Sequence, residues 1–100
     1  MDDKEKEALY VEIKDTYGIR SQESKLVEKC IELGAAILRY HGRRATINSI
    51  IEEAADVEII IEQLHRFYQV VGFGEKFQEI KKVKLANIKR QLEEEKRIRH

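Results

Sequence analysis

Residues 47–68 read INSIIEEAADVEIIIEQLHRFY, and this stretch decides the fold class. Its apolar residues recur every three or four positions, which is the period of an α-helix that buries one face. This stripe comprises Val57, Ile60, Leu64 and Phe67. Three more isoleucines lie on other sides of the same helix, so the helix needs more than one apolar neighbour. They are Ile51, Ile59 and Ile61.

Glycines and capping residues divide the rest of the chain into further helices. We expect helices over Asp2 to about Asp15, Ser21 to about Tyr40, Ile47 to about Val71 and Glu75 to about Arg97. Gly72-Phe73-Gly74 makes the clearest break between them. The expected architecture is all-α: a helical bundle of about four helices in a single domain over residues 1–100. Residues 1–16 hold the N-terminal helix, and residues 93–100 form a frayed tail.

Composition and charge exclude several classes of protein. The chain has 100 residues, 38% of them charged, and its formal net charge is zero. A neutral chain lacks the basic field that attracts nucleic acids, so we expect neither DNA nor RNA as a partner. The charged N-terminus and the short apolar runs are not typical of a signal peptide or of a membrane span. We therefore expect a cytoplasmic protein with no membrane partner, whose single cysteine, Cys30, is a small core residue.

The helix expected over residues 21–40 carries an apolar arc that is too broad for one neighbour. The members of the arc are Leu26, Val27, Cys30, Ile31, Leu33, Gly34, Ile37 and Leu38. A monomer would leave much of this surface in contact with water. The pattern therefore predicts an oligomer, either a homodimer or a homotetramer.

Four carboxylates depart from this apolar pattern. Glu53 and Asp56 share a helical face with the stripe that should be buried, and Glu28 and Glu32 lie at the edge of the apolar arc. An antiparallel pairing of the two helices would bring all four together. A carboxylate in an apolar interior needs a cation, a metal or a proton, and Mg²⁺ binds several carboxylate oxygens. The alternative is that these residues belong to the solvated surface of a charge-rich helical protein.

The stretch YGIRSQESKLVEKCIELGAAILRY (17–40), followed by residues 47–68, resembles a known family. This is the small, phage-type branch of the MazG-like all-α nucleoside triphosphate pyrophosphohydrolases, and the resemblance covers about residues 17–92. The family carries an ExxE motif on one helix and an ExxD motif on the next, and the four carboxylates bind Mg²⁺, with Mn²⁺ as a substitute. Its members are dimers or tetramers of helical bundles. Here the ExxD motif is intact as Glu53-Ala54-Ala55-Asp56.

The ExxE motif departs from the family pattern. Glu32 matches its second glutamate, but Lys29 occupies the position of the first. An ammonium group offsets negative charge and offers no acceptor oxygen, so the affinity for a metal should fall. Either Glu28 replaces the missing ligand, or Lys29 forms an internal ion pair and leaves a folded but inactive relative.

The resemblance implies a Mg²⁺-dependent nucleoside triphosphate pyrophosphohydrolase that releases a nucleoside monophosphate and pyrophosphate. It assigns catalysis to Glu32, Glu53 and Asp56, with Glu28 as a further metal ligand. Five basic residues are candidates for binding the substrate phosphates. They are Arg43, Arg44, Lys81, Lys82 and Lys84. Two alternatives stay open: a catalytically impaired relative that binds nucleotides or acts as a structural helical oligomer, and an unrelated helical interaction module.

Overall fold

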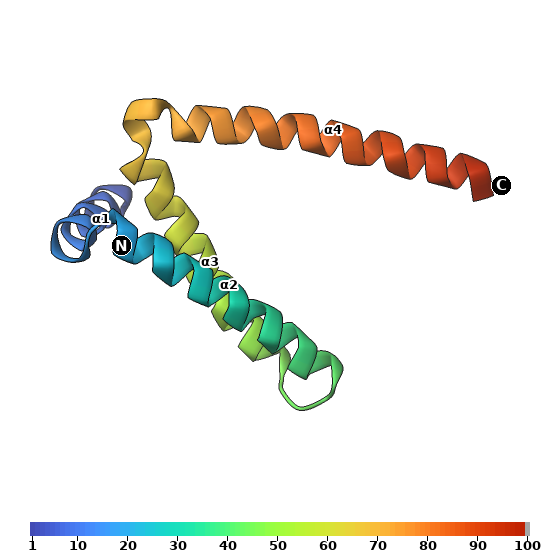
Figure 1. The fold of residues 1–100 in the computed structure, drawn as a ribbon, viewed down its shortest axis with the longest axis horizontal. Helices are drawn as coiled ribbons and strands as arrows, with labels where there is room; N and C mark the ends of the chain where they lie inside the picture. The colour runs from blue at the N-terminus through green and yellow to red at the C-terminus, as the bar shows by residue number, and fades with distance from the viewer. Residues whose placement is uncertain (100) are drawn as a thin grey trace. The chain divides into compact units, whose positions relative to one another are not determined.

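The computed structural model describes residues 1–99, and all of its regular elements are helical (Figure 1). The helices are α1 (Asp3–Tyr17), α2 (Ile19–His41), α3 (Ile47–Phe67) and α4 (Phe73–Arg99), with a short 3-10 helix, η1 (Gln69–Val71). These residues contain no strand, so the expected all-α class is confirmed. No helix among them is both long and apolar enough to cross a membrane.

The chain divides into two units, which are described separately. The first, Met1–Phe67, contains α1, α2 and α3, and the second begins at Tyr68 and contains η1 and α4. The expected single domain over residues 1–100 stays a prediction. The tail expected over residues 93–100 is helical as far as Arg99, and residue 100 lies outside the described part of the chain.

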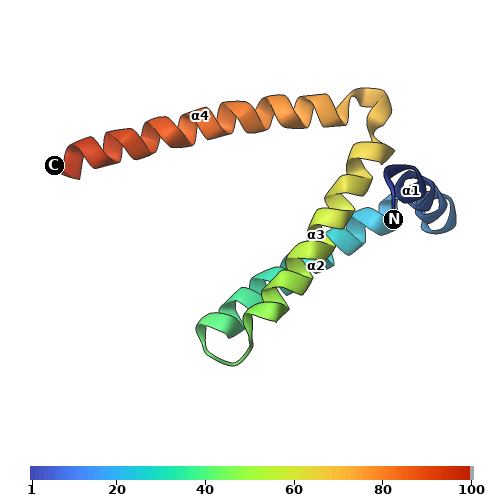
Figure 2. The same cartoon turned by 180° about the vertical axis from the view of Figure 1, so that it is seen from behind.

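Two of the helices in the first unit, α2 and α3, form an antiparallel hairpin (Figures 1 and 2). The loop between them, residues 42–46, is tight. The amide of Arg44 donates to the carbonyl of Arg39 over 2.8 Å, and Arg43 has a positive φ of 59°. This turn sends the chain back along α2 and places the middle of α3 opposite the middle of α2.

Helix α1 packs against the hairpin through ion pairs and one buried aromatic ring. Its first turn is capped by Asp2, whose side chain accepts a hydrogen bond of 2.8 Å from the amide of Glu5. Lys6 Nζ lies 2.6 Å from Glu62 Oε1 of α3, and Glu7 pairs with Arg66. Tyr10, one turn further along α1, is buried.

The boundary between α1 and α2 is sharper than the sequence suggests. Helix α1 runs to Tyr17 rather than to about Asp15, and α2 begins at Ile19 rather than at Ser21. Gly18 alone separates them, with a φ of 85° that side-chain-bearing residues rarely adopt. Because Gly18 changes the chain direction within one residue, α2 begins without a side-chain cap.

The boundary between α3 and α4 also differs from the prediction. Helix α3 ends at Phe67, and residues 69–71 tighten into η1, where one continuous helix to about Val71 is expected. Gly72, in the left-handed region at a φ of 70°, closes η1 through a 3.0 Å bond from its amide to the carbonyl of Gln69. Helix α4 then starts at Phe73, two residues before the expected Glu75.

The core of the first unit is small. Its buried apolar side chains are Tyr10, Ala36, Ile60 and Phe67. Ile60 and Phe67 belong to the predicted stripe, and Val57 and Leu64 of that stripe are half-buried. Cys30 is exposed, so its assignment to the core is wrong. The side of α2 that faces α3 carries Ala36, and Cys30 lies on another side of the helix.

Replacing Ile60 with alanine should lower the free energy of unfolding by about 2–4 kcal/mol, because the change leaves a cavity between packed helices. Val11→Ala on the exposed part of α1 should change it by less than about 0.5 kcal/mol. Urea unfolding followed by circular dichroism at 222 nm measures both. Equal effects of the two substitutions would contradict the assignment of Ile60 to the core.

Candidate functional site

The hairpin of α2 and α3 brings three carboxylates and one ammonium group together. Lys29 and Glu32 lie one helical turn apart on α2, and Glu53 and Asp56 lie one turn apart on α3. Because the two helices are antiparallel, these two turns face each other. We call this set of four residues the carboxylate cluster.

Lys29 connects the two helices. Its Nζ donates to Glu32 Oε2 over 3.1 Å and lies 3.3 Å from Asp56 Oδ2. These two carboxylates hold the pKa of Lys29 above its usual value, so the lysine is firmly protonated. Of the two outcomes that the sequence leaves open for Lys29, the structure has the internal ion pair.

Glu53 is the least satisfied member of the carboxylate cluster. Its Oε2 is buried and has no hydrogen-bond partner. Loss of contact with water, together with the neighbouring carboxyl group of Glu32, raises the pKa of Glu53 above its usual value. The hydrogen bond from Lys29 lowers the pKa of Glu32. The cluster thus contains two glutamates whose pKa values are shifted in opposite directions.

The charge of the carboxylate cluster is not balanced. One ammonium group faces three carboxylates, so the site keeps an excess of negative charge when all of its groups are ionised. Carboxylate oxygens are the ligands that Mg²⁺ prefers, and a buried oxygen without a partner is a vacant acceptor. By chemistry alone, the oxygens of Glu32, Glu53 and Asp56 are of the kind that a divalent cation binds, whereas the ammonium group of Lys29 offers no acceptor.

Glu28 does not join the carboxylate cluster. It is exposed on α2, and no ion pair recorded for residues 1–99 involves it. Nor do three acidic, histidine or cysteine side chains in this part of the chain stand in an arrangement ready to hold a metal ion. The predicted metal set of Glu28, Glu32, Glu53 and Asp56 stays a prediction, and its last three members are the ones that surround Lys29.

A cavity of about 220 Å³ in the first unit adjoins the carboxylate cluster. Lys29 and Asp56 line one part of it, and the side chains of two buried glutamines, Gln22 and Gln63, line another. Gln63 is only 3% exposed, yet its Oε1 has no hydrogen-bond partner. A buried amide oxygen without a donor is costly, so Gln63 is an unsatisfied part of the cavity wall.

Sequence reasoning missed these two glutamines. A lone glutamine in a charge-rich helix is typical of a solvated face. One signal could have found Gln63: it is four residues before Phe67 and three after Ile60, and thus belongs to the same buried face.

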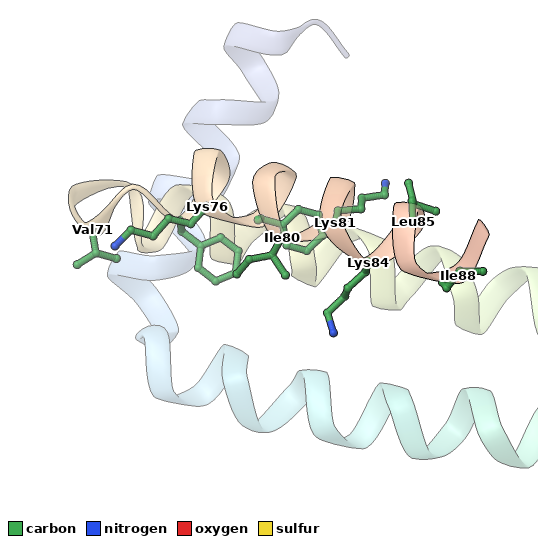
Figure 3. Close-up of a pocket in the computed structure, with 9 residues that line it drawn as sticks. Val71, Lys76, Ile80, Lys81, Lys84, Leu85 and Ile88 are labelled. Carbon is green, nitrogen blue, oxygen red and sulfur yellow. The ribbon is translucent and has the colours of Figure 1, made fainter. Parts of the chain in front are cut away.

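The basic residues expected to bind phosphates lie in two places. Arg43 and Arg44 are exposed in the loop between α2 and α3. Lys81 and Lys84 belong to α4 in the second unit, where they line an apolar groove, and Lys82 is exposed on the same helix (Figure 3). The two arginines belong to the first unit and the three lysines to the second, so their grouping into one phosphate-binding site stays a prediction.

Comparison of the chain with protein-family models, with curated proteins and with solved structures finds no match.

Lys29→Met should raise the pKa of both Glu32 and Glu53, because the substitution removes the ammonium group that favours their ionised forms. Carbon-detected NMR titration of the glutamate side chains measures both values. Lys25→Met, one turn earlier on α2 and exposed, is the matched control and should change neither value. A Glu32 pKa that is unaffected by Lys29→Met would show that the ion pair does not persist in solution.

Proposed function

We propose that this protein is a Mg²⁺-dependent nucleoside triphosphate pyrophosphohydrolase whose site is built on the carboxylate cluster. The observation that carries the proposal is the convergence of Glu32, Glu53 and Asp56 from two helices, with the buried Oε2 of Glu53 unpaired. The likeness of residues 17–92 to the MazG-like family supports the choice of reaction. Mn²⁺ is the expected substitute for Mg²⁺.

In this proposal, Glu32, Glu53 and Asp56 would hold the divalent ion once the Lys29 side chain had moved away. The ion supplies positive charge that neutralises the triphosphate oxygens. Glu53, whose Oε2 has no hydrogen-bond partner in the metal-free chain, would act as the general base. It takes a proton from the water molecule that attacks the α-phosphorus. The products are a nucleoside monophosphate and pyrophosphate.

The basic side chains are proposed to help bind the substrate. Arg43 and Arg44, in the loop after α2, and Lys81, Lys82 and Lys84, on α4, are the candidates for binding the phosphates of the substrate. One guanidinium group can bind two phosphate oxygens at once, so the two arginines are better candidates than the lysines. Glu28 is exposed beside Lys29 and is the reserve ligand for the metal.

The cavity beside the carboxylate cluster is the proposed place of the nucleoside. Its volume of about 220 Å³ is below the roughly 300–1,000 Å³ usual for pockets that enclose whole ligands. It therefore suits one end of a ligand whose charged end reaches the cluster. Gln22 and Gln63 would hydrogen-bond the base or the sugar.

A second candidate function follows from the Lys29 ion pairs. Lys29 already neutralises part of the carboxylate cluster, so the chain can fold there without a metal. On this reading the protein is a catalytically impaired relative that binds nucleotides or acts as a structural helical oligomer. Isothermal titration with Mg²⁺ separates the two functions, because this candidate requires that the native protein bind no metal and that Lys29→Glu restore binding.

We also propose that the chain forms a homodimer or a homotetramer. Three apolar side chains on α2, Val27, Ile31 and Leu38, leave more than half of their surface exposed. They lie on one face together with Gly34, where an added Cβ would meet no atom within 4 Å. A second copy could approach closely at this face. Sedimentation that shows only monomer at high micromolar concentration would contradict the proposal.

Pyrophosphate release from ribo- and deoxyribonucleoside triphosphates, with Mg²⁺ or Mn²⁺, tests the proposed reaction. We expect turnover by the native chain. Asp56→Asn should lower the turnover rate by roughly 100-fold or more, because it replaces a charged carboxylate ligand of the metal with a neutral amide. Lys29→Glu should raise the affinity for Mg²⁺. Glu52→Gln alters an exposed neighbour on α3 and should leave turnover unchanged.

The variants also separate the two candidate functions. Activity that appears only after Lys29→Glu supports the impaired relative. Absence of pyrophosphate release from both the native chain and Lys29→Glu would contradict the proposed enzyme activity.

Gln63→Leu should weaken binding of nucleoside monophosphates by about 3–10-fold, because one hydrogen bond to the ligand is lost. The same change should leave the melting temperature equal or higher, since it removes a buried polar atom that has no partner. Calorimetric titration and thermal unfolding measure the two effects, and exposed Gln78→Leu is the control. A lower melting temperature with unchanged affinity would make Gln63 a structural residue only.

A further inference from the structure

The second unit contains a long amphipathic helix, α4, whose apolar side is not covered by any other described part of that unit. Within this unit, α4 packs only against η1, through stacked rings: Tyr68 and Phe73 have centroids 6.0 Å apart, and Phe73 and Phe77 6.1 Å apart. Beyond this aromatic end, the apolar side chains of α4 leave at least half of their surface exposed. They include Ile80, Leu85, Ile88 and Leu92.

This side of α4 forms a groove of about 590 Å³ (Figure 3). Its floor is apolar from Val71 and Phe77 to Leu85 and Ile88. Lys81 and Lys84 also line the groove, and their ammonium groups extend away from the ribbon. The uncovered side therefore carries positive charge in its first half.

The second half of the same side carries charges of both signs, from Glu95 and from Arg99 one turn later. At 100° per residue, Glu95 falls in line with Phe77, Lys84 and Ile88, and Lys81 lies beside them. These positions, with Gln91, recur at alternating intervals of four and three residues and therefore lie along one side of the helix. Glu95 contacts Arg99 over 3.9 Å, and both side chains are mostly exposed, so this ion pair is weak.

We propose that two copies of this chain pair through α4 in an antiparallel manner, with Ile88 near the two-fold axis. In that arrangement Lys81 of each copy lies opposite Glu95 of the other, because both are seven residues from Ile88. The apolar side chains around Ile88 then cover each other. A parallel pairing would set Lys81 and Lys84 against themselves and Glu95 against itself, which is unfavourable. The complementary charges of Lys81 and Glu95, at equal distances from Ile88, thus favour a second copy of the same helix as the occupant.

This pairing does not depend on the proposed enzyme activity. It uses α4 of the second unit, whereas the carboxylate cluster and the exposed α2 face belong to the first. Its test is disulfide cross-linking in the full chain. Cys30 is exposed and must first be replaced, so all variants carry Cys30→Ser.

Ile88→Cys should cross-link rapidly between chains under mild oxidation, because a residue on the two-fold axis meets its own copy. Ile98→Cys is the matched control on the same helix, also exposed. In the antiparallel pair the two copies of residue 98 are about 30 Å apart at a rise of 1.5 Å per residue, too far for a disulfide. Equal cross-linking at both positions, or none between chains at Ile88→Cys, would overturn the proposal.

Charge reversal tests the register. In the Ile88→Cys background, Lys81→Glu or Glu95→Lys alone should weaken the pairing by roughly tenfold, because each sets like charges opposite one another twice. The double variant should restore it. Lys82→Glu changes the charge on another side of α4 and should have no effect. Single reversals without effect, or a double variant without recovery, would overturn the register.

Discussion

The contact between one turn of α2 and one turn of α3 sets the character of this molecule. Three carboxylates meet there, and charges of one sign on adjacent helices repel each other. The packing of the hairpin forces these carboxylates together, because burial of Ile60 on α3 and of Ala36 on α2 fixes which faces of the two helices meet.

 Both of these side chains, Ile60 and Ala36, are buried in the core of the first unit. The ammonium group of Lys29 offsets part of this excess of negative charge.

Lys29 and a divalent cation satisfy the carboxylate cluster in different ways. The ammonium group carries one charge and can only donate hydrogen bonds, so the buried Oε2 of Glu53 is left without a partner. A divalent ion carries twice the charge and can coordinate carboxylate oxygens on several sides. The side chains of Lys29, Glu32 and Asp56 are partly exposed, and ion pairs in contact with water are weak. The chain therefore folds at this site without a metal ion, and the Lys29 side chain can move out of the cluster at a small cost in free energy.

The sequence predicts the helices better than it predicts the site. Helical spacing of apolar residues and the glycines at 18 and 72 were enough to place four helices, because both signals are local. The exact ends depended on the positive φ angles of Gly18 and Gly72, and backbone angles are not visible in a sequence pattern. The convergence of Glu32, Glu53 and Asp56 followed from antiparallel packing and was predicted. Gln63 was missed because burial of an amide depends on which face α1 and α2 cover, and that is a tertiary property.

The exposed apolar side chains give the proposed association its energetic reason. Among the described residues only four apolar side chains are buried, namely Tyr10, Ala36, Ile60 and Phe67. A chain of 100 residues with so small a core gains little from the removal of apolar surface from water, and that gain must still offset the entropy lost on folding. The exposed faces of α2 and α4 hold most of the remaining apolar surface. Covering them with further copies would supply burial that the isolated chain lacks, so folding and association would be coupled.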